Sequence, residues 1–432
     1  MLFDNLSVDS SGRLTFAGLL PRDLLDAFGS PLYVMDEDLI RARCRLYKQA
    51  MKDAFGGKSL PLYASKACCF KRMYRILAEE GLGADVVSPG EIATAVHAGF
   101  DPSHLYFHNN SKSDPDIRYA LQAGVGTIVA DGTDELDALE RILSETGRKQ
   151  NVLLRITPGI DPHTYTEVST GQVDSKFGEP IETGQAMAFV RHALSLPHLS
   201  VKGFHCHVGS QVYDASVFIR SAAKMVGFIR DVKDACGYLP EQLDLGGGYG
   251  VKYRDCDPTF DLAASIGEIG AHLKRGCAEA GLPLPAVLLE PGRSVVADAG
   301  ITLYTVNSVK HVQGYKNYVA VDGGMGDNPR YALYGAPYTV VLPERMNEPA
   351  AALYDVVGKF CESGDILQPA VPLPDTVRRG DILAVLTTGA YNYSMASHYN
   401  RVPKPAVVMI RNGVPSLAVR RETPDDLCAF DL

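Results

Sequence analysis

Long apolar runs are absent from this sequence of 432 residues. No stretch approaches the roughly 18 apolar residues that a membrane-spanning helix needs, so we expect no association with a membrane. The opening residues, Met-Leu-Phe-Asp-Asn-Leu, also lack the basic segment followed by an apolar one that marks a secretory signal peptide. These two absences predict a cytoplasmic protein.

An excess of basic charge is absent as well. Lys and Arg number 42 against 51 Asp and Glu, which gives a net charge of −9. A nucleic-acid-binding surface is basic and clustered, so we expect no nucleic acid as a partner. The remaining composition, with 46% hydrophobic and 22% charged residues, is typical of a globular protein.

Paired cysteine spacing is the third absence. The nine cysteines are an odd number and none has the spacing of a zinc site, which favours reduced thiols in the cytoplasm. His205 and His207 alternate along one expected strand and would face the same side. Because no third ligand at a suitable spacing is evident, we expect no metal site.

Strand-like runs and helical patterns alternate along the chain up to about residue 298. The apolar runs that read as strands are 61–66, 84–88, 104–108, 126–131, 151–156, 201–207, 242–246 and 286–290. The helical patterns between them cover 68–80, 90–98, 115–123, 133–146, 183–195, 215–236 and 261–280, and another covers 36–55. Such alternation predicts parallel strands with helical crossovers. Since eight strands close a barrel, we favour an α/β fold with a (β/α)8 TIM-type barrel over 36–297 to an open doubly wound sheet.

Beyond residue 298 the pattern changes to strand-like runs that glycine and proline turns separate. These runs are 301–309, 318–321, 338–342, 381–386, 406–410 and 416–421. They predict a second, mostly antiparallel β domain, sandwich-like or barrel-like, built from 298–432 together with 1–35.

Polar residues stand at or near the ends of the expected barrel strands, where such barrels carry their chemistry. They are Lys66, Asp85, Arg155, His207, Gly246–Gly248 and Glu290. Because the carboxyl ends of the strands meet at one mouth, we expect these residues to converge there.

Four of the features at this mouth suit a phosphorylated aromatic aldehyde. The Lys66 amine can form an imine, and the Gly246–Gly248 turn leaves backbone N–H groups open to a phosphate. His207 can stack on a flat ring, and Ser210 can bind the phosphate. Glycines also simply make turns, so it is their position after the seventh strand that favours phosphate.

Glu290 completes the set. It emerges from an apolar strand, and a buried carboxylate needs a partner. An ion pair with Arg293 or Arg155 would supply one, and so would the protonated nitrogen of a pyridine ring. With the lysine, the glycine turn and the histidine, the second reading predicts a pyridoxal 5'-phosphate site.

Longer motifs resemble those of the diaminopimelate decarboxylases, which are alanine-racemase-like (fold type III) pyridoxal-phosphate enzymes. The resemblance spans about residues 30 to 405. Its motifs are Tyr63–Ala67, Asp174–Gly178, His205–Gln211, Gly246–Gly250, Glu290–Arg293, Asp327–Gly335, Cys361–Asp365 and Gly389–Tyr391.

The resemblance implies a role for each residue of these motifs that we single out. Lys66 would hold the cofactor as an imine, His207 would stack on its ring, and Glu290 would meet its ring nitrogen. The other implied cofactor-binding residues are Ser210, Gly248, Pro291, Gly292, Arg293 and Tyr391. The implied substrate-binding residues are Arg293, Arg330, Tyr334, Glu362 and Tyr391. Cys361 would return a proton after loss of CO2.

The resemblance also implies an assembly and a reaction. The family forms a homodimer with shared active sites, in which Cys361 and Glu362 come from the other subunit. The implied reaction converts the amino acid meso-2,6-diaminopimelate to L-lysine and CO2, the last step of lysine biosynthesis. Arg330 offers a bidentate fork to the distal carboxylate, and Glu362 offers a counter-charge to the ammonium.

Other readings remain open. Ornithine, arginine and carboxynorspermidine decarboxylases share the fold but handle a different distal group. A racemase gives no reason for the Cys361–Glu362 pair, and a non-catalytic regulatory homologue would be expected to lose Lys66 or Cys361. Two departures from the family pattern stand at 107–112, Phe-His-Asn-Asn-Ser-Lys, and at Tyr331, where proline is usual.

Overall fold

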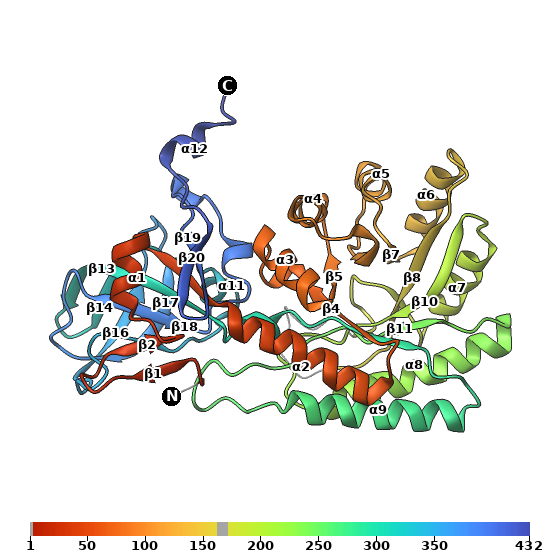
Figure 1. The fold of residues 1–432 in the computed structure, drawn as a ribbon, viewed down its shortest axis with the longest axis horizontal. Helices are drawn as coiled ribbons and strands as arrows, with labels where there is room; N and C mark the ends of the chain where they lie inside the picture. Colours follow the sequence, from red (N-terminus) through yellow and green to blue (C-terminus); the bar gives the residue numbers. More distant parts are fainter. Residues whose placement is uncertain (1–2, 162–171) are drawn as a thin grey trace. The chain divides into compact units, whose positions relative to one another are not determined.

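A computed structural model describes residues 3–161 and 172–432 of the chain. The chain divides into two compact units (Figure 1). The barrel unit combines 43–250 and 259–294, and the β unit combines 1–42, 251–258 and 295–432.

The barrel unit is built on eight parallel strands. They are β4 (Leu60–Ala64), β5 (Gly83–Val86), β6 (Leu105–Phe107), β7 (Thr127–Ala130), β8 (Gln150–Thr157), β10 (Leu199–His205), β11 (Gln242–Asp244) and β12 (Ala286–Leu289). Each pairs with the next, β8 pairs with β10, and β12 returns to β4 and closes the barrel. The two-residue strand β9 (Glu179–Pro180) adds to β8 outside the ring. The predicted (β/α)8 barrel is confirmed.

Helices follow the barrel strands, as the sequence periodicity predicts. They are α3 (Lys71–Glu80), α4 (Pro89–Ala98), α5 (Asp114–Ala123), α6 (Thr133–Ser144), α7 (Gln185–Ser195), α8 (Ala215–Cys236) and α9 (Leu262–Glu279). The helix α2 (Glu37–Phe55) leads into β4. Leu62, Tyr106, Val129, Leu153 and Leu288 form an apolar cluster contributed by β4, β6, β7, β8 and β12. This packed interior leaves the chemistry to the residues at the strand ends.

The β unit contains a mixed sheet in the order β17-β16-β14-β13-β3-β19-β20, with β18 and β15 branching from β13. Its strands are β3 (Leu32–Asp36), β13 (Gly300–Val312), β14 (Lys316–Val321), β15 (Val340–Val341), β16 (Ala352–Val357), β17 (Ile366–Leu373), β18 (Ile382–Leu386), β19 (Ala406–Arg411) and β20 (Val414–Val419). Only β14–β16 and β3–β19 pair in parallel among the described strands of this sheet. The predicted mostly antiparallel second domain is therefore confirmed.

Smaller elements complete the β unit. β1 (Leu6–Val8) and β2 (Leu14–Phe16) form a separate pair, and α1 (Pro21–Phe28), α10 (Arg293–Val296), α11 (Arg330–Tyr334) and α12 (Pro424–Cys428) are short helices. α10 begins in the barrel unit and ends in the β unit. Of the described strands, β1, β3, β9, β16 and β17 were not predicted from the sequence, whereas a strand was expected at 12–16, where β2 lies. Within the described ranges, no helix combines the length and apolar character needed to cross a membrane.

Candidate active site

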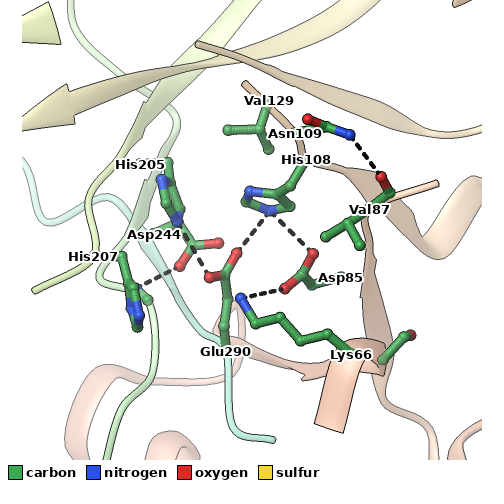
Figure 2. Close-up of polar contacts among 12 residues, drawn as sticks. Lys66, Asp85, Val87, His108, Asn109, Val129, His205, His207, Asp244 and Glu290 are labelled. Carbon is green, nitrogen blue, oxygen red and sulfur yellow. Dashed lines mark hydrogen bonds and ion pairs between the residues drawn. The ribbon is translucent and has the colours of Figure 1, made fainter. Parts of the chain in front are cut away.

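Lys66 lies directly after β4, in the middle of the single turn η1 (Ser65–Ala67). The hydroxyl of Tyr74 donates to Oγ of Ser65 over 2.8 Å and holds this turn. Nζ of Lys66 lies 3.9 Å from Oδ2 of Asp85, at the end of β5 (Figure 2). The lysine side chain is 44% exposed, whereas that of Asp85 is 1% exposed. The amine is therefore accessible and has a buried carboxylate beside it.

Glu290 follows β12 and has a histidine at each carboxylate oxygen. Nε2 of His108 lies 2.7 Å from Oε1, and Nε2 of His205 lies 3.2 Å from Oε2 (Figure 2). His108 comes directly after β6 and His205 ends β10, and all three residues are buried. The sequence offered Arg293 or Arg155 as partners for this carboxylate, and the histidines take that place.

The protonation of this cluster follows from burial and neighbouring charge. Burial raises the pKa of Glu290, but its contacts with His108 and His205 outweigh burial, so this pKa lies well below its usual range. Burial and the charge of Glu290 raise the pKa of Asp244 well above its usual range. Burial lowers the pKa of His205 to about 4. These shifts favour the charged form of Glu290 and the neutral forms of Asp244 and His205.

The positions of His108, His205 and Glu290 correct one expectation of the sequence analysis. We expected no third ligand beside His205 and His207. Ligand atoms of His108, His205 and Glu290 in fact lie within 4.8 Å of one another, and His207 is not among them. The partners come from β6 and β12, so spacing along the chain could not reveal them. His205 is hydrogen-bonded to the carboxylate, and His108 forms an ion-pair contact with its other oxygen.

His207, two residues beyond His205, faces the glycine turn. Its Nδ1 accepts a hydrogen bond of 3.2 Å from the N–H of Gly247. Burial and the nearby charge of Lys66 lower the pKa of His207 well below its usual range. The imidazole is therefore neutral, and a neutral imidazole can stack on another flat ring.

The turn Gly246–Gly248 has no room for side chains. Gly246 and Gly248 have φ values of +71° and +110°, which only glycine adopts readily. A Cβ on Gly247 would lie 1.9 Å from the carbonyl oxygen of Glu290, and one on Gly248 would lie 1.9 Å from that of Gly209. The backbone after β11 therefore packs directly against the backbone after β10 and β12.

Arg293 lies beside this turn. Its Nε and Nη2 donate to Oγ of Ser210 over 3.3 and 3.1 Å, and it is 8% exposed. The carbonyl of Pro291 accepts a hydrogen bond of 2.9 Å from the N–H of Ala64, and a Cβ on Gly292 would lie 3.0 Å from Cβ of Ala64. The segment after β12 is thereby fixed against the end of β4. All predicted site residues of the barrel unit are brought to one mouth.

Arg155 contacts the motif Asp174–Gly178 through Phe177. It lies on β8, with Nε 3.8 Å from Oδ1 of Asp131. Its guanidinium carbon lies 4.3 Å from the ring centroid of Phe177. This cation–π contact fixes the motif beside the strand.

Hydrogen bonds of Lys112 and Asn109 fix the loop at 107–112, which departs from the family pattern. The side chain of Lys112 has no exposed surface, and its Nζ donates to the carbonyls of Asn109 and Val129 and to Oε1 of Glu135, over 2.8, 2.7 and 2.7 Å. Nδ2 of Asn109 donates to the carbonyl of Val87 over 3.1 Å (Figure 2). The departure from the family pattern thus leaves His108 on a firmly held segment.

The β unit carries the remaining predicted residues. Arg330 lies on α11, is 4% exposed, and donates from Nη1 to the hydroxyl of Tyr338 over 2.9 Å. Its guanidinium carbon lies 4.5 Å from the ring centroid of Tyr253. Tyr334 ends the same helix, and Tyr331, the second departure, is half-buried on it. The two tyrosines around the guanidinium were not predicted.

Cys361 and Glu362 are exposed on the loop between β16 and β17. The N–H of Cys361 donates to Oδ1 of Asn400 over 2.8 Å. Buried Asp365 accepts hydrogen bonds from the N–H groups of Phe360 and Met325 over 2.7 and 2.6 Å. The aspartate of this motif therefore fixes the loop that presents the thiol and the carboxylate.

Tyr391 follows β18 and has a left-handed φ of +60°, which is uncommon for a bulky residue. Burial lowers the pKa of Arg330, but the neighbouring tyrosines, Tyr391 among them, outweigh burial and raise this pKa. Tyr391 and Arg330 thus belong to one polar group of the β unit.

Sequence reasoning missed His108, Asp244, Tyr253 and Tyr338. His108 and Asp244 stand at strand ends, as do the residues that it found, so the same rule could have included them. Tyr253 and Tyr338 lie far apart in the sequence and carried no signal there.

Comparisons with known proteins agree with this geometry. Residues 37–297 match the family described as pyridoxal-dependent decarboxylase, pyridoxal binding domain. Diaminopimelate decarboxylase of Bacillus subtilis (strain 168) is 44% identical over 98% of this chain and 95% of its own length. That of Staphylococcus aureus (strain COL) is 41% identical over 98% of both. The crystal structure of diaminopimelate decarboxylase from M. jannaschii in co-complex with L-lysine has a TM-score of 0.90 and 32% identity, covering 99% of this chain and 98% of that one. The chain therefore belongs to the diaminopimelate decarboxylase family of pyridoxal-dependent decarboxylases.

Proposed function

We propose that this protein converts meso-2,6-diaminopimelate to L-lysine and CO2 with pyridoxal 5'-phosphate as its cofactor, the last step of lysine biosynthesis. The observation that carries the proposal is the meeting of Lys66, Glu290 and the Gly246–Gly248 turn at one mouth of a closed barrel. Membership of the family supports the reaction.

The residues at the mouth fit the cofactor. The N–H groups of Gly246 and Gly247 already donate to Asp244 and His207, so within the turn it is Gly248 that can hold a phosphate, together with the nearby Arg293–Ser210 pair. Anionic Glu290 can bind a protonated ring nitrogen. We propose Ser210, Gly248, Pro291, Gly292, Arg293 and Tyr391 as its further binding residues. When bound, the cofactor supplies an electron sink for the charge left on the substrate's α-carbon.

Lys66 binds the cofactor covalently in this proposal. The amine must be uncharged to act as a nucleophile, and Asp85 can accept its proton, with Oδ2 3.9 Å from Nζ. His207 presents a neutral imidazole to one face of the bound ring.

The substrate has a carboxylate and an ammonium at its far end, and the β unit offers a partner for each. We propose that Arg293, Arg330, Tyr334 and Tyr391 bind substrate, with the guanidinium of Arg330, preorganised by Tyr253 and Tyr338, for the carboxylate. Glu362 binds the ammonium, and Cys361 gives a proton from Sγ to the α-carbon after CO2 leaves.

We further propose a cytoplasmic homodimer with shared active sites, in which Cys361 and Glu362 serve the partner's cofactor. Both are exposed in the single chain, as residues that complete another subunit's site would be. In domain terms, 36–297 would bind the cofactor, and 1–35 with 298–432 would supply substrate and dimer contacts.

An assay of CO2 release from meso-diaminopimelate beside ornithine, arginine and lysine tests the proposal. We expect turnover of meso-diaminopimelate to exceed the others. Greater turnover of ornithine or arginine would show that this amino acid, and not meso-diaminopimelate, is the substrate. If the protein binds the cofactor but turns over none of the four amino acids, a non-catalytic homologue is favoured.

A further inference from the structure

The histidines beside Glu290 have no role in the reaction proposed above, yet they occupy both of its oxygens. The contacts are 2.7 Å from Nε2 of His108 and 3.2 Å from Nε2 of His205 (Figure 2). His108, His205 and Glu290 are 5%, 1% and 6% exposed. Bulk water therefore does not solvate this carboxylate, and the two imidazoles stabilise its charge instead.

Glu290 is one of three buried carboxyl groups at this end of the barrel. Asp85 is 1% and Asp244 is 0% exposed. Neighbouring buried carboxyl groups cannot all ionise, because each charge raises the cost of the next. Hydrogen-bond donors decide which one ionises. Glu290 has a hydrogen bond from His205 at one oxygen and Nε2 of His108 2.7 Å from the other, whereas Oδ1 of Asp244 accepts one backbone N–H, that of Gly246, over 2.8 Å.

The two imidazoles also fix the direction of the carboxylate. Their rings meet edge to face, with centroids 4.8 Å apart. The backbone N–H of His108 donates to the carbonyl of Val86 over 2.8 Å, and the Lys112 contacts hold the loop that follows. Each imidazole therefore approaches Glu290 from a fixed position.

We propose that His108 and His205 are positioning residues that keep the negative charge on Glu290, rather than on Asp244, and orient its carboxylate. The inference rests on the proposed function in one respect, which is that Glu290 meets the cofactor's ring nitrogen. A fixed anion at that point keeps the nitrogen protonated.

The first test uses 15N-histidine NMR of the cofactor-free protein, with signals assigned from His108→Gln and His205→Gln. We expect both rings to carry the proton on Nε2, and both signals to shift in Glu290→Gln. As a control, Glu140→Gln removes the partner of His198 on the outside of the barrel, where Nδ1 and Oε1 are 2.6 Å apart, and should move only His198. Unchanged His108 and His205 signals in folded Glu290→Gln would overturn the proposal.

A chelator arm separates hydrogen bonding from metal binding. Treatment with EDTA should leave the signals of His108 and His205 in place, because their Nε2 protons lie on the carboxylate. Signals that move as a stoichiometric metal is removed would identify the three groups as ligands and contradict the proposal.

The second test titrates the cofactor-free variants with pyridoxal 5'-phosphate. His108→Leu should weaken binding roughly tenfold or more through loss of a bond to a charged group, and His108→Gln, whose amide keeps a donor, should recover most of it. The control His192→Leu removes a 2.6 Å contact to Asp137 on the outside of the barrel and should bind like the wild type.

The outcomes of the titration separate the two proposals. If His108→Gln binds as weakly as His108→Leu, the donor role of the histidine is wrong. If Glu290→Gln binds the cofactor and turns over like the wild type, the role of Glu290 in the proposed function fails. The NMR result decides the histidines' effect on Glu290 in either case.

Discussion

Oδ2 of Asp365 accepts a hydrogen bond of 2.7 Å from the backbone N–H of Phe360, the residue before Cys361. Its other oxygen accepts one of 2.6 Å from Met325. Because Asp365 is 3% exposed, water cannot replace these bonds. The chemistry assigned to Cys361 and Glu362 therefore depends on a neighbour that need not touch substrate.

Asp365→Asn should lower turnover about tenfold or more, because its amide can accept only one of the two bonds and each is worth roughly 1.5–3 kcal/mol. Cofactor absorption should remain, since the barrel residues are unchanged. The control Asp375→Asn, at an exposed position of the same unit, should keep full activity. Unaltered turnover in Asp365→Asn would show that the loop does not need this carboxylate.

Cys361→Ala should cut turnover by about a hundredfold or more, because a positioned proton donor contributes on the order of 10²–10⁴-fold. Cofactor binding, followed by absorption, should be largely intact. Cys428→Ala, which removes another exposed thiol, is the matched control. Equal loss in both variants would argue against a specific role for Cys361.

The shared site is tested by mixing inactive subunits. In mixed dimers of Lys66→Ala and Cys361→Ala, one of the two sites would contain both native residues, so part of the activity should return. Dimer exchange is verified first with differently tagged subunits. No recovery in dimers that are shown to be mixed contradicts a site shared in this way.

Arg330→Lys should raise KM for the substrate roughly tenfold or more. Lysine keeps the charge but loses the planar fork and the stacking on Tyr253. Steady-state kinetics measure the effect, and the affinity for the cofactor should not change. Arg379→Lys, an exposed arginine bonded to the carbonyl of Asn307, should behave as the wild type. A selective loss of cofactor affinity in Arg330→Lys would contradict the assignment.

His205 predicts a pH dependence of stability in the cofactor-free protein. Its folded-state pKa of about 4 is below the ordinary 6.5, so between these values the unfolded chain binds a proton that the folded chain does not. Stability from this group is therefore present above pH 6.5 and is lost as the pH falls toward 4. Urea unfolding at pH 5 and 7.5 should show a smaller loss in His205→Gln than in the wild type. The control His192→Gln should keep the wild-type loss, and an equal loss in all three proteins would contradict the prediction.

The barrel could be predicted because its strands are short apolar runs at a regular rhythm. The β unit was harder. β3 follows the break Gly29-Ser30-Pro31, which hides a strand that is buried throughout and lies between β13 and β19. β17 contains Pro369 and Pro372, which argue against a strand, and it is tolerated because it lies at the edge of the sheet.

In the site, too, some features could be predicted from the sequence and others could not. Residues such as Lys66 and Glu290 could be placed at the mouth because strand ends converge there. Which side chains touch across the mouth depends on closure of the barrel, so the contacts of Glu290 with His108 and His205 did not follow from the sequence. The family resemblance drawn from the motifs is confirmed, while the roles of single residues remain proposals.

Absorption spectroscopy of the purified protein and its Lys66→Ala variant tests the cofactor site most directly. The wild type should show the visible band of cofactor bound covalently through a lysine, and the folded variant should lack it even with added pyridoxal 5'-phosphate. Lys71→Ala, a change at the start of α3, should keep the band. A band that persists unchanged in Lys66→Ala would contradict the assignment of the site.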